Sequence, residues 1–94
     1  MSYRVYFIEN PMGRTYIGLS DDVDRRVRDH NEGISKWTRL RGPWKLKWIS
    51  RKFEVLGEAR KLENLLKRQK GGAGLKAKLL ENGEFFTEGG DGNI

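Results

Sequence analysis

The sequence predicts an α+β fold, a small three-stranded antiparallel sheet flanked by helices in the order β-β-α-β-α-α. Three observations predict this class. Two β-branched and aromatic runs separated by turn residues open the chain, two later segments carry apolar residues at helical spacing, and a third β-type segment lies between those two. At 94 residues the core is small, because a chain of this size buries only roughly 60–65% of its unfolded surface.

The first twenty residues predict a hairpin. Residues 3–9 and 14–19 have the composition of strands, and residues 10–13 (Asn-Pro-Met-Gly) have the composition of a turn. A loop with an odd number of residues would make Tyr6 and Tyr16 face each other across the hairpin, and an even loop would place them on opposite faces. We predict the odd loop.

A helix should follow the hairpin. Residues 20–22 (Ser-Asp-Asp) supply an N-cap, and the helix is expected to run to about Asn31 and to stop at Gly33. Arg26 and His30 are four residues apart, which places them on one side of the helix at the edge of its apolar stripe. That stripe consists of Val23 and Val27.

Residues 44–53 predict the third strand, in which Trp44 and Trp48 are expected on one face and pack in the core. A strong helix is predicted over residues 58–70, and a short one over residues 74–80. Glu63 falls on the flank of the apolar face of the stronger helix rather than opposite it. The apolar face itself consists of Ala59, Leu62, Leu65 and Leu66.

The charge of the chain is unevenly distributed. The net charge is +6, but residues 1–80 carry +10 and residues 81–94 carry −4. We therefore predict that residues 1–80 form the single folded domain and that residues 81–94 form a flexible, acidic, glycine-rich tail.

Residues 33–53 carry seven basic residues and no acidic one, with tryptophans among them. A basic run is often only a solvated face, but lysine and arginine neutralise phosphates and aromatic rings stack on bases, so the run favours a polyanionic partner. Trp37 lies in a polar loop and is the better stacking candidate. The candidate nucleic-acid-binding residues are Lys36, Trp37, Arg39, Arg41 and Lys67.

Several classes of protein are excluded or disfavoured. The absence of cysteine removes disulfide scaffolds and thiolate metal sites, and a single histidine removes zinc sites built on several histidines. The longest apolar run, residues 5–8, is far short of a membrane-spanning helix, and no signal peptide is visible. We expect a soluble, cytoplasmic protein that has no membrane partner.

One set of residues fits phosphodiester hydrolysis, which requires a base for the attacking water, positive charge at the phosphorus and a carboxylate for a hard cation. Tyr6 and Tyr16 could supply a phenolic acid or base, and Arg26 a fixed positive charge. Glu63 could hold Mg²⁺, and His30 could hydrogen-bond the nucleophile or the phosphate.

Each of these residues also has a purely structural interpretation. A strand tyrosine usually packs in a core, Arg26 could pair only with Asp22 or Asp29, and Glu63 could pair only with Lys67 four residues later. Spacing alone does not separate the two interpretations.

The same residues make the chain resemble the GIY-YIG nuclease superfamily, in its small single-domain bacterial form. Arg4-Val5-Tyr6 stands where the family has Gly-Ile-Tyr, with Arg4 in place of the small glycine, and Tyr16-Ile17-Gly18 matches the second half of the motif. Arg26 and His30 match the Arg-x-x-x-His helix of the family, and Glu63 matches its metal-binding glutamate. The resemblance covers about residues 3–70.

The resemblance implies an endonuclease that hydrolyses DNA with Mg²⁺ or Mn²⁺, on structured or branched DNA and in repair or recombination. Glu63 would bind the metal, Arg26 would stabilise the transition state, His30 would assist, and either Tyr6 or Tyr16 would activate the water. A separate targeting protein could supply specificity. The alternatives are a catalytically inactive nucleic-acid-binding module that uses residues 36–52, and an adaptor whose basic face meets an acidic protein.

Overall fold

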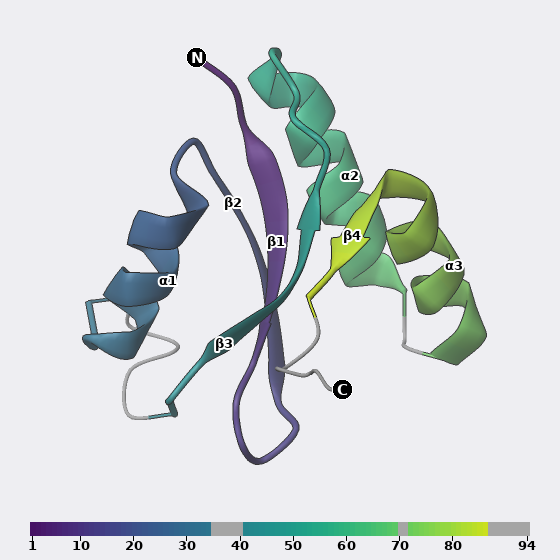
Figure 1. The fold of residues 1–94 in the computed structure, drawn as a ribbon. Coiled ribbons are helices and arrows are strands. Elements are labelled where there is room, and N and C mark those ends of the chain that lie inside the picture. The colour runs from purple at the N-terminus through teal and green to yellow at the C-terminus, as the bar shows by residue number, and fades with distance from the viewer. Residues whose placement is uncertain (35–40, 70–71, 87–94) are drawn as a thin grey trace.

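The computed structural model describes residues 1–34, 41–69 and 72–86 (Figure 1). Seven elements follow one another in the order β-β-α-β-α-α-β. They are β1 (Arg4–Glu9), β2 (Thr15–Ser20), α1 (Val23–Asn31), β3 (Lys45–Ser50), α2 (Leu56–Arg68), α3 (Gly72–Asn82) and β4 (Gly83–Phe85).

The sheet has four antiparallel strands in the order β2-β1-β3-β4, so the prediction of three strands was wrong. The fourth strand lies within residues 81–94, whose glycine and acid content suggested a tail. Contacts with β3 define this strand: it pairs with β3, and the backbone N–H of Phe86 just after it donates to the carbonyl of Lys47 at 2.8 Å. A glycine begins this strand because a β-carbon at Gly83 would overlap the backbone of Ile49 and Ser50.

The hairpin has the odd loop that the sequence predicted. Ile8 pairs with Tyr16 and Tyr6 pairs with Gly18, so the two tyrosines lie on the same face in diagonal positions and do not face each other directly as predicted. The side chain of Asn10 is buried in the turn, where its oxygen accepts hydrogen bonds from the backbone N–H groups of Met12 at 3.1 Å and Arg14 at 2.8 Å. This side chain fixes the turn and therefore the register.

The helices cover the two faces of the sheet and divide the core into two clusters (Figure 1). α1 packs on one face, over a cluster that includes Tyr6, Ile8 and Val23. α2 and α3 pack on the other face, over a cluster that includes Val5 and Leu66. Within the described residues, no helix has the length and apolar character needed to cross a membrane.

A bulge in β3 separates the two strand-region tryptophans, which we predicted on one face. Phe7 pairs with Trp48 and Ile8 pairs with Leu46, so Lys47 is an extra residue that has no partner in β1. One inserted residue reverses the alternation of side chains, which places Trp44 in the cluster under α1 and Trp48 in the cluster under α2. Both are buried, as predicted.

The helix boundaries differ modestly from the predicted ones. α1 begins after Asp22, whose carboxylate accepts from the N–H of Arg25 at 3.1 Å, and it ends before Gly33, as expected. α2 begins two residues earlier than predicted, because the carbonyl of Val55 already accepts from the N–H groups of Glu58 and Ala59. α3 is longer than residues 74–80 at both ends.

Candidate active site

A buried hydrogen bond joins β1 to α1. The hydroxyl of Tyr6 lies 2.7 Å from Nε2 of His30, and each residue exposes only 1% of its surface. When the imidazole proton is on Nδ1, Nε2 accepts this bond from the phenol. The i, i+4 position that the sequence indicated for His30 thus points at the sheet rather than at solvent.

Tyr16 completes an aromatic group around this bond. Its ring centroid lies 6.4 Å from that of Tyr6 and 4.9 Å from that of His30, edge-on to the imidazole. Unlike the other two residues, Tyr16 remains partly exposed. It is therefore the member of the group that a ligand can touch.

Arg26 brings positive charge to the same place from one turn earlier in α1. Its Nη1 lies 3.2 Å from Oδ2 of Asp29, so one of the two structural pairings that the sequence allowed is present. Burial is the main cause that lowers the pKa of His30 to about 4, and the charge of Arg26 adds to this effect. The imidazole is consequently neutral at pH 7.

Burial also raises the pKa of the Tyr6 phenol to about 12. The neighbouring Tyr16 adds to the rise, the guanidinium of Arg26 opposes it, and the charge of Glu63 adds a smaller increment. Tyr6 is therefore protonated near neutral pH, and its hydroxyl is placed to donate a hydrogen bond to Nε2 of His30.

Two residues not singled out as site residues position the group. The side chain of Asn31 donates to the carbonyl of Trp44 at 3.0 Å and accepts from its N–H, which ties the end of α1 to the start of β3. Gly18 lies under the ring of Tyr6, which a β-carbon at that position would overlap. Only the paired register makes this role of Gly18 visible, whereas an asparagine at a helix end is a weak sequence signal.

Glu63 approaches from α2, which packs against β2 and β1 on the other face of the sheet. Its side chain is buried, as the flank position predicted, with 5% of the residue exposed. Oε1 lies 3.2 Å from Nη1 of Arg60, and Oε2 lies 3.2 Å from Nζ of Lys67. The predicted Lys67 pairing is present, whereas the Arg60 pairing was not foreseen.

The donor set fits a hydrated hard cation. Among the described residues, no group of three or more histidine, aspartate or glutamate side chains could hold a metal ion. Mg²⁺ is commonly bound by one or two carboxylates together with waters and substrate phosphates, so the single carboxylate of Glu63 is sufficient in type. Both of its oxygens are paired with cationic groups, so a metal ion would have to displace at least one of these contacts.

Of the predicted nucleic-acid-binding residues, Arg41 and Lys67 lie within the described part of the chain. Lys36, Trp37 and Arg39 lie outside the described residues. The carbonyl of Arg41 accepts a hydrogen bond from the Asn10 side chain at 2.8 Å, which places the arginine next to the hairpin turn. Lys67 lies beside Glu63 on α2.

Comparisons with known proteins identify the family of the chain. Residues 2–76 match the model of the GIY-YIG catalytic domain, and the chain belongs to that family. It is 36% identical over 91 residues to a UPF0213 protein of Streptococcus pneumoniae serotype 4, covering 96% of this chain and 83% of that one. A UPF0213 protein of Halobacterium salinarum is 39% identical over 67 residues, covering 70% of this chain and 86% of that one.

A solved structure is also similar. The solution NMR structure of the UPF0213 protein BH0048 from Bacillus halodurans matches with a TM-score of 0.50 and 34% identity, covering 86% of this chain and 84% of that chain. In the sequence comparison, 47 residues of this chain align with BH0048 at 45% identity, and the alignment covers half of the length of BH0048.

Proposed function

We propose that this protein is a divalent-metal-dependent endonuclease that hydrolyses phosphodiester bonds in DNA. The observation that supports it best is the Tyr6–His30 hydrogen bond, with Tyr16 and Arg26 around it, in a chain that belongs to the GIY-YIG family. A structural core alone gives no reason to bury a histidine and a phenol together beside a partly exposed guanidinium, because buried polar groups cost free energy unless they are paired.

The roles follow from exposure and charge. Tyr16 is the accessible phenol, so it orients the attacking water and takes its proton. Tyr6 and His30 are buried and act through Tyr16, as positioning residues that hold its ring. Arg26 carries the positive charge that stabilises the pentacoordinate phosphorus.

The step balances when one water oxygen forms a bond to phosphorus and one phosphorus–oxygen ester bond breaks. Tyr16 first gives its own proton to solvent. The resulting phenolate oxygen then accepts one proton of the attacking water, and the departing alkoxide takes a proton from solvent. Glu63 would hold the metal, which supplies charge neutralisation on the phosphate and lowers the pKa of water. Binding of the metal would then require either Lys67 or Arg60 to release its contact with the carboxylate of Glu63.

The test is cleavage of a panel of duplex, single-stranded, nicked and branched DNAs in Mg²⁺. We expect Glu63→Gln to lower cleavage at least a hundredfold while DNA binding is retained, because only the metal-dependent step is removed. Glu58→Gln removes the same charge at an exposed position of α2 and is the matched control. Equal cleavage by the wild type and Glu63→Gln would refute the mechanism.

One observation favours a second function, a nucleic-acid-binding module that does not cleave. Both oxygens of Glu63 already have cationic partners, and an ion pair can be the whole purpose of a buried carboxylate. This alternative predicts salt-dependent DNA binding in the wild type with no cleavage of any DNA in the panel, in either Mg²⁺ or Mn²⁺.

A further inference from the structure

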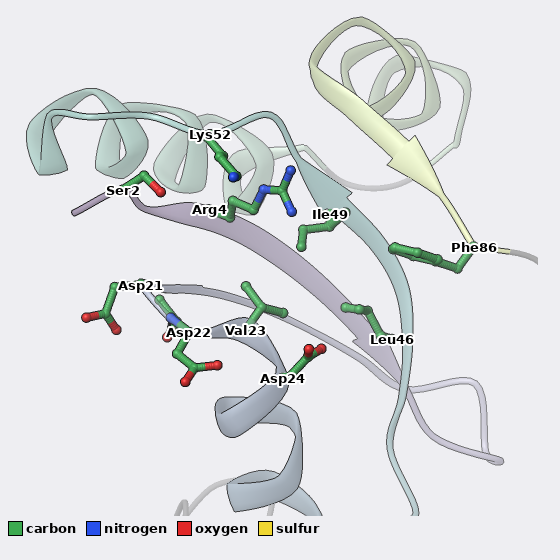
Figure 2. A pocket seen from close by; sticks show the side chains of 11 residues that line it. Ser2, Arg4, Asp21, Asp22, Val23, Asp24, Leu46, Ile49, Lys52 and Phe86 are labelled. Carbon is green, nitrogen blue, oxygen red and sulfur yellow. Dashed lines mark hydrogen bonds between the residues drawn. The ribbon is translucent and has the colours of Figure 1, made fainter.

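A polar cavity lies on the same face of the sheet as Tyr6. Its volume is about 520 Å³, and Arg4, Lys52, Ile49 and Phe86 are among its lining residues. Figure 2 shows Arg4 and Lys52 pointing into it from one side, with the aspartates at the start of α1 on the other side. An adjoining cavity of about 490 Å³ shares Arg4, Ile49 and Lys52.

Among the described residues, the two cations of this cavity have no ion-pair partners. Nε of Arg4 is buried without a hydrogen bond, and neither Arg4 nor Lys52 forms an ion pair with any described residue. In contrast, Arg25 and Arg26 are each paired with an aspartate. A buried donor without a partner costs free energy, so a ligand that supplies a hydrogen-bond acceptor would be stabilised in this cavity. Because the two cations are neighbours, the favoured acceptor is an anion.

The position of Arg4 relates this anion to the candidate active site. Arg4 and Tyr6 are two residues apart in β1, so their side chains leave the same face about 6.8 Å from each other. That separation is on the scale of neighbouring phosphates in an extended nucleic-acid strand. A strand with one phosphate at the active site can therefore place the next at Arg4 and Lys52.

The rest of the cavity suits a base rather than more phosphate. Phe86 exposes 46% of its surface, and its backbone is fixed by the hydrogen bond to Lys47. Asp21 pairs with Arg25 and Asp22 caps α1, while Asp24 has no ion-pair partner among the described residues. Carboxylates repel phosphates but accept hydrogen bonds from the amino groups of a base, so they exclude a polyphosphate from this side.

We propose that this cavity binds one unpaired nucleotide, with its phosphate on Arg4 and Lys52 and its base stacked on Phe86. The placement of this nucleotide next to the cleaved phosphate rests on the proposed function. A paired base cannot reach Phe86 without leaving its duplex, and the site therefore selects DNA with single-stranded character beside the cut.

The first experiment measures binding in EDTA, where no cleavage occurs. A single-stranded oligonucleotide containing 2-aminopurine and a blunt duplex of the same length are titrated, with anisotropy and 2-aminopurine emission as readouts. We expect Arg4→Met/Lys52→Met to weaken single-strand binding roughly tenfold and to reduce the salt slope by about one, with a smaller effect on the duplex. Lys52→Met alone, at an exposed position, should show part of this loss with the fold intact.

The matched control is Lys61→Met/Arg68→Met, which removes the same charge from exposed positions of α2 on the other face. Equal weakening by the two double variants would overturn the proposal, because it would show that only total charge matters. Failure of Lys52→Met to weaken binding at low salt would also overturn it.

The second experiment tests the base. We expect Phe86→Ala to weaken single-strand binding roughly tenfold and to abolish the 2-aminopurine quenching. Phe85→Ala, at the last residue of β4 and outside the lining of the cavity, should do neither. Competition separates a nucleotide site from a free-phosphate site, since deoxyadenosine monophosphate should displace the oligonucleotide at lower concentration than inorganic phosphate. Equal competition, or equal effects of the two phenylalanine variants, would refute base binding.

The two proposals fail separately. Binding in EDTA does not depend on catalysis, so absence of cleavage by the wild type would refute the nuclease and leave the nucleotide site standing. Cleavage that is lost in Glu63→Gln, combined with unchanged single-strand binding in Arg4→Met/Lys52→Met, would do the reverse.

Discussion

At the scale of single residues, burial controls the chemistry around His30. The imidazole is enclosed by the sheet and α1, hydrogen-bonded to Tyr6 and close to the guanidinium of Arg26. Protonation would therefore place a charge where the protein can neither hydrate it nor pair it well. The sequence showed that Arg26 and His30 share one side of a helix, but their depth depends on how that helix docks.

This burial predicts acid-sensitive stability. The pKa of His30 in the folded protein, about 4, lies below its ordinary value of about 6.5, so the unfolded chain binds more protons between these values. The free energy of unfolding should therefore fall as the pH drops from about 6.5 to about 4, by roughly 3 kcal/mol from this residue. Urea unfolding across this range checks the decline.

His30→Gln is the appropriate comparison, since glutamine can still accept a hydrogen bond from Tyr6 but does not titrate. The difference in unfolding free energy between the wild type and this variant should shrink as the pH falls. A difference that stays constant from pH 7.5 to pH 4.5 would show that His30 is not the titrating group.

Gly18 gives a second prediction at this scale. Gly18→Ala should cost about 1–3 kcal/mol of unfolding free energy, because the new methyl group meets the ring of Tyr6. The ring must then move away from His30. Gly57→Ala, at a helical position with open space around it, should be neutral or stabilising, and thermal unfolding of the two variants compares them. Similar losses in both would contradict this account.

At the scale of elements, the strongly patterned segments were predictable and the context-dependent ones were not. α1 carries its own N-cap and stop signals, and the hairpin turn carries proline, glycine and a buried asparagine. β4 has only three residues and no pattern of its own, so its pairing with β3 alone defines it. The bulge at Lys47 was likewise not predictable, because the alternation of side chains within β3 does not show that Lys47 has no pairing partner in β1.

Truncation tests the role of β4. A chain of residues 1–80 loses β4, the carbonyl of Asn82 that accepts from Arg51 at 2.9 Å, and the Phe86 hydrogen bond to Lys47. We expect it to lose about 2–4 kcal/mol of unfolding free energy, whereas residues 1–86 should match the full chain. Urea unfolding of the three chains checks this. Equal stability of the 1–80 chain and the full chain would make β4 dispensable.

At the scale of the whole molecule, the charge distribution determines how DNA is approached. The net charge of +6 includes two acidic residues, Glu88 and Asp91, in the last eight positions. A basic protein attracts a polyanion over a distance that salt shortens, and acidic residues on the same chain reduce that attraction.

Removal of residues 87–94 should therefore raise the net charge to +8 and tighten DNA binding roughly two- to threefold at low salt, with the gain vanishing near 0.5 M. Glu88→Gln/Asp91→Asn in the full chain is the charge-matched control and should reproduce the gain. Fluorescence anisotropy at several salt concentrations measures both. A gain from truncation that the double substitution does not reproduce would exclude charge as the cause.

The sequence by itself determined the α+β class, the hairpin with its two tyrosines on one face, the helix that carries Arg26 and His30, and the flank position of Glu63. These features depend on local periodicity and on caps, which lie within a few residues of each other. The tertiary structure decided the 2.7 Å contact of Tyr6 with His30, the pairing of Arg60 with Glu63, the separation of the two tryptophans and the burial of Nε of Arg4 without a hydrogen-bond partner among the described residues. Each depends on a neighbour distant in sequence or on a packed helix face, and no local pattern records such contacts.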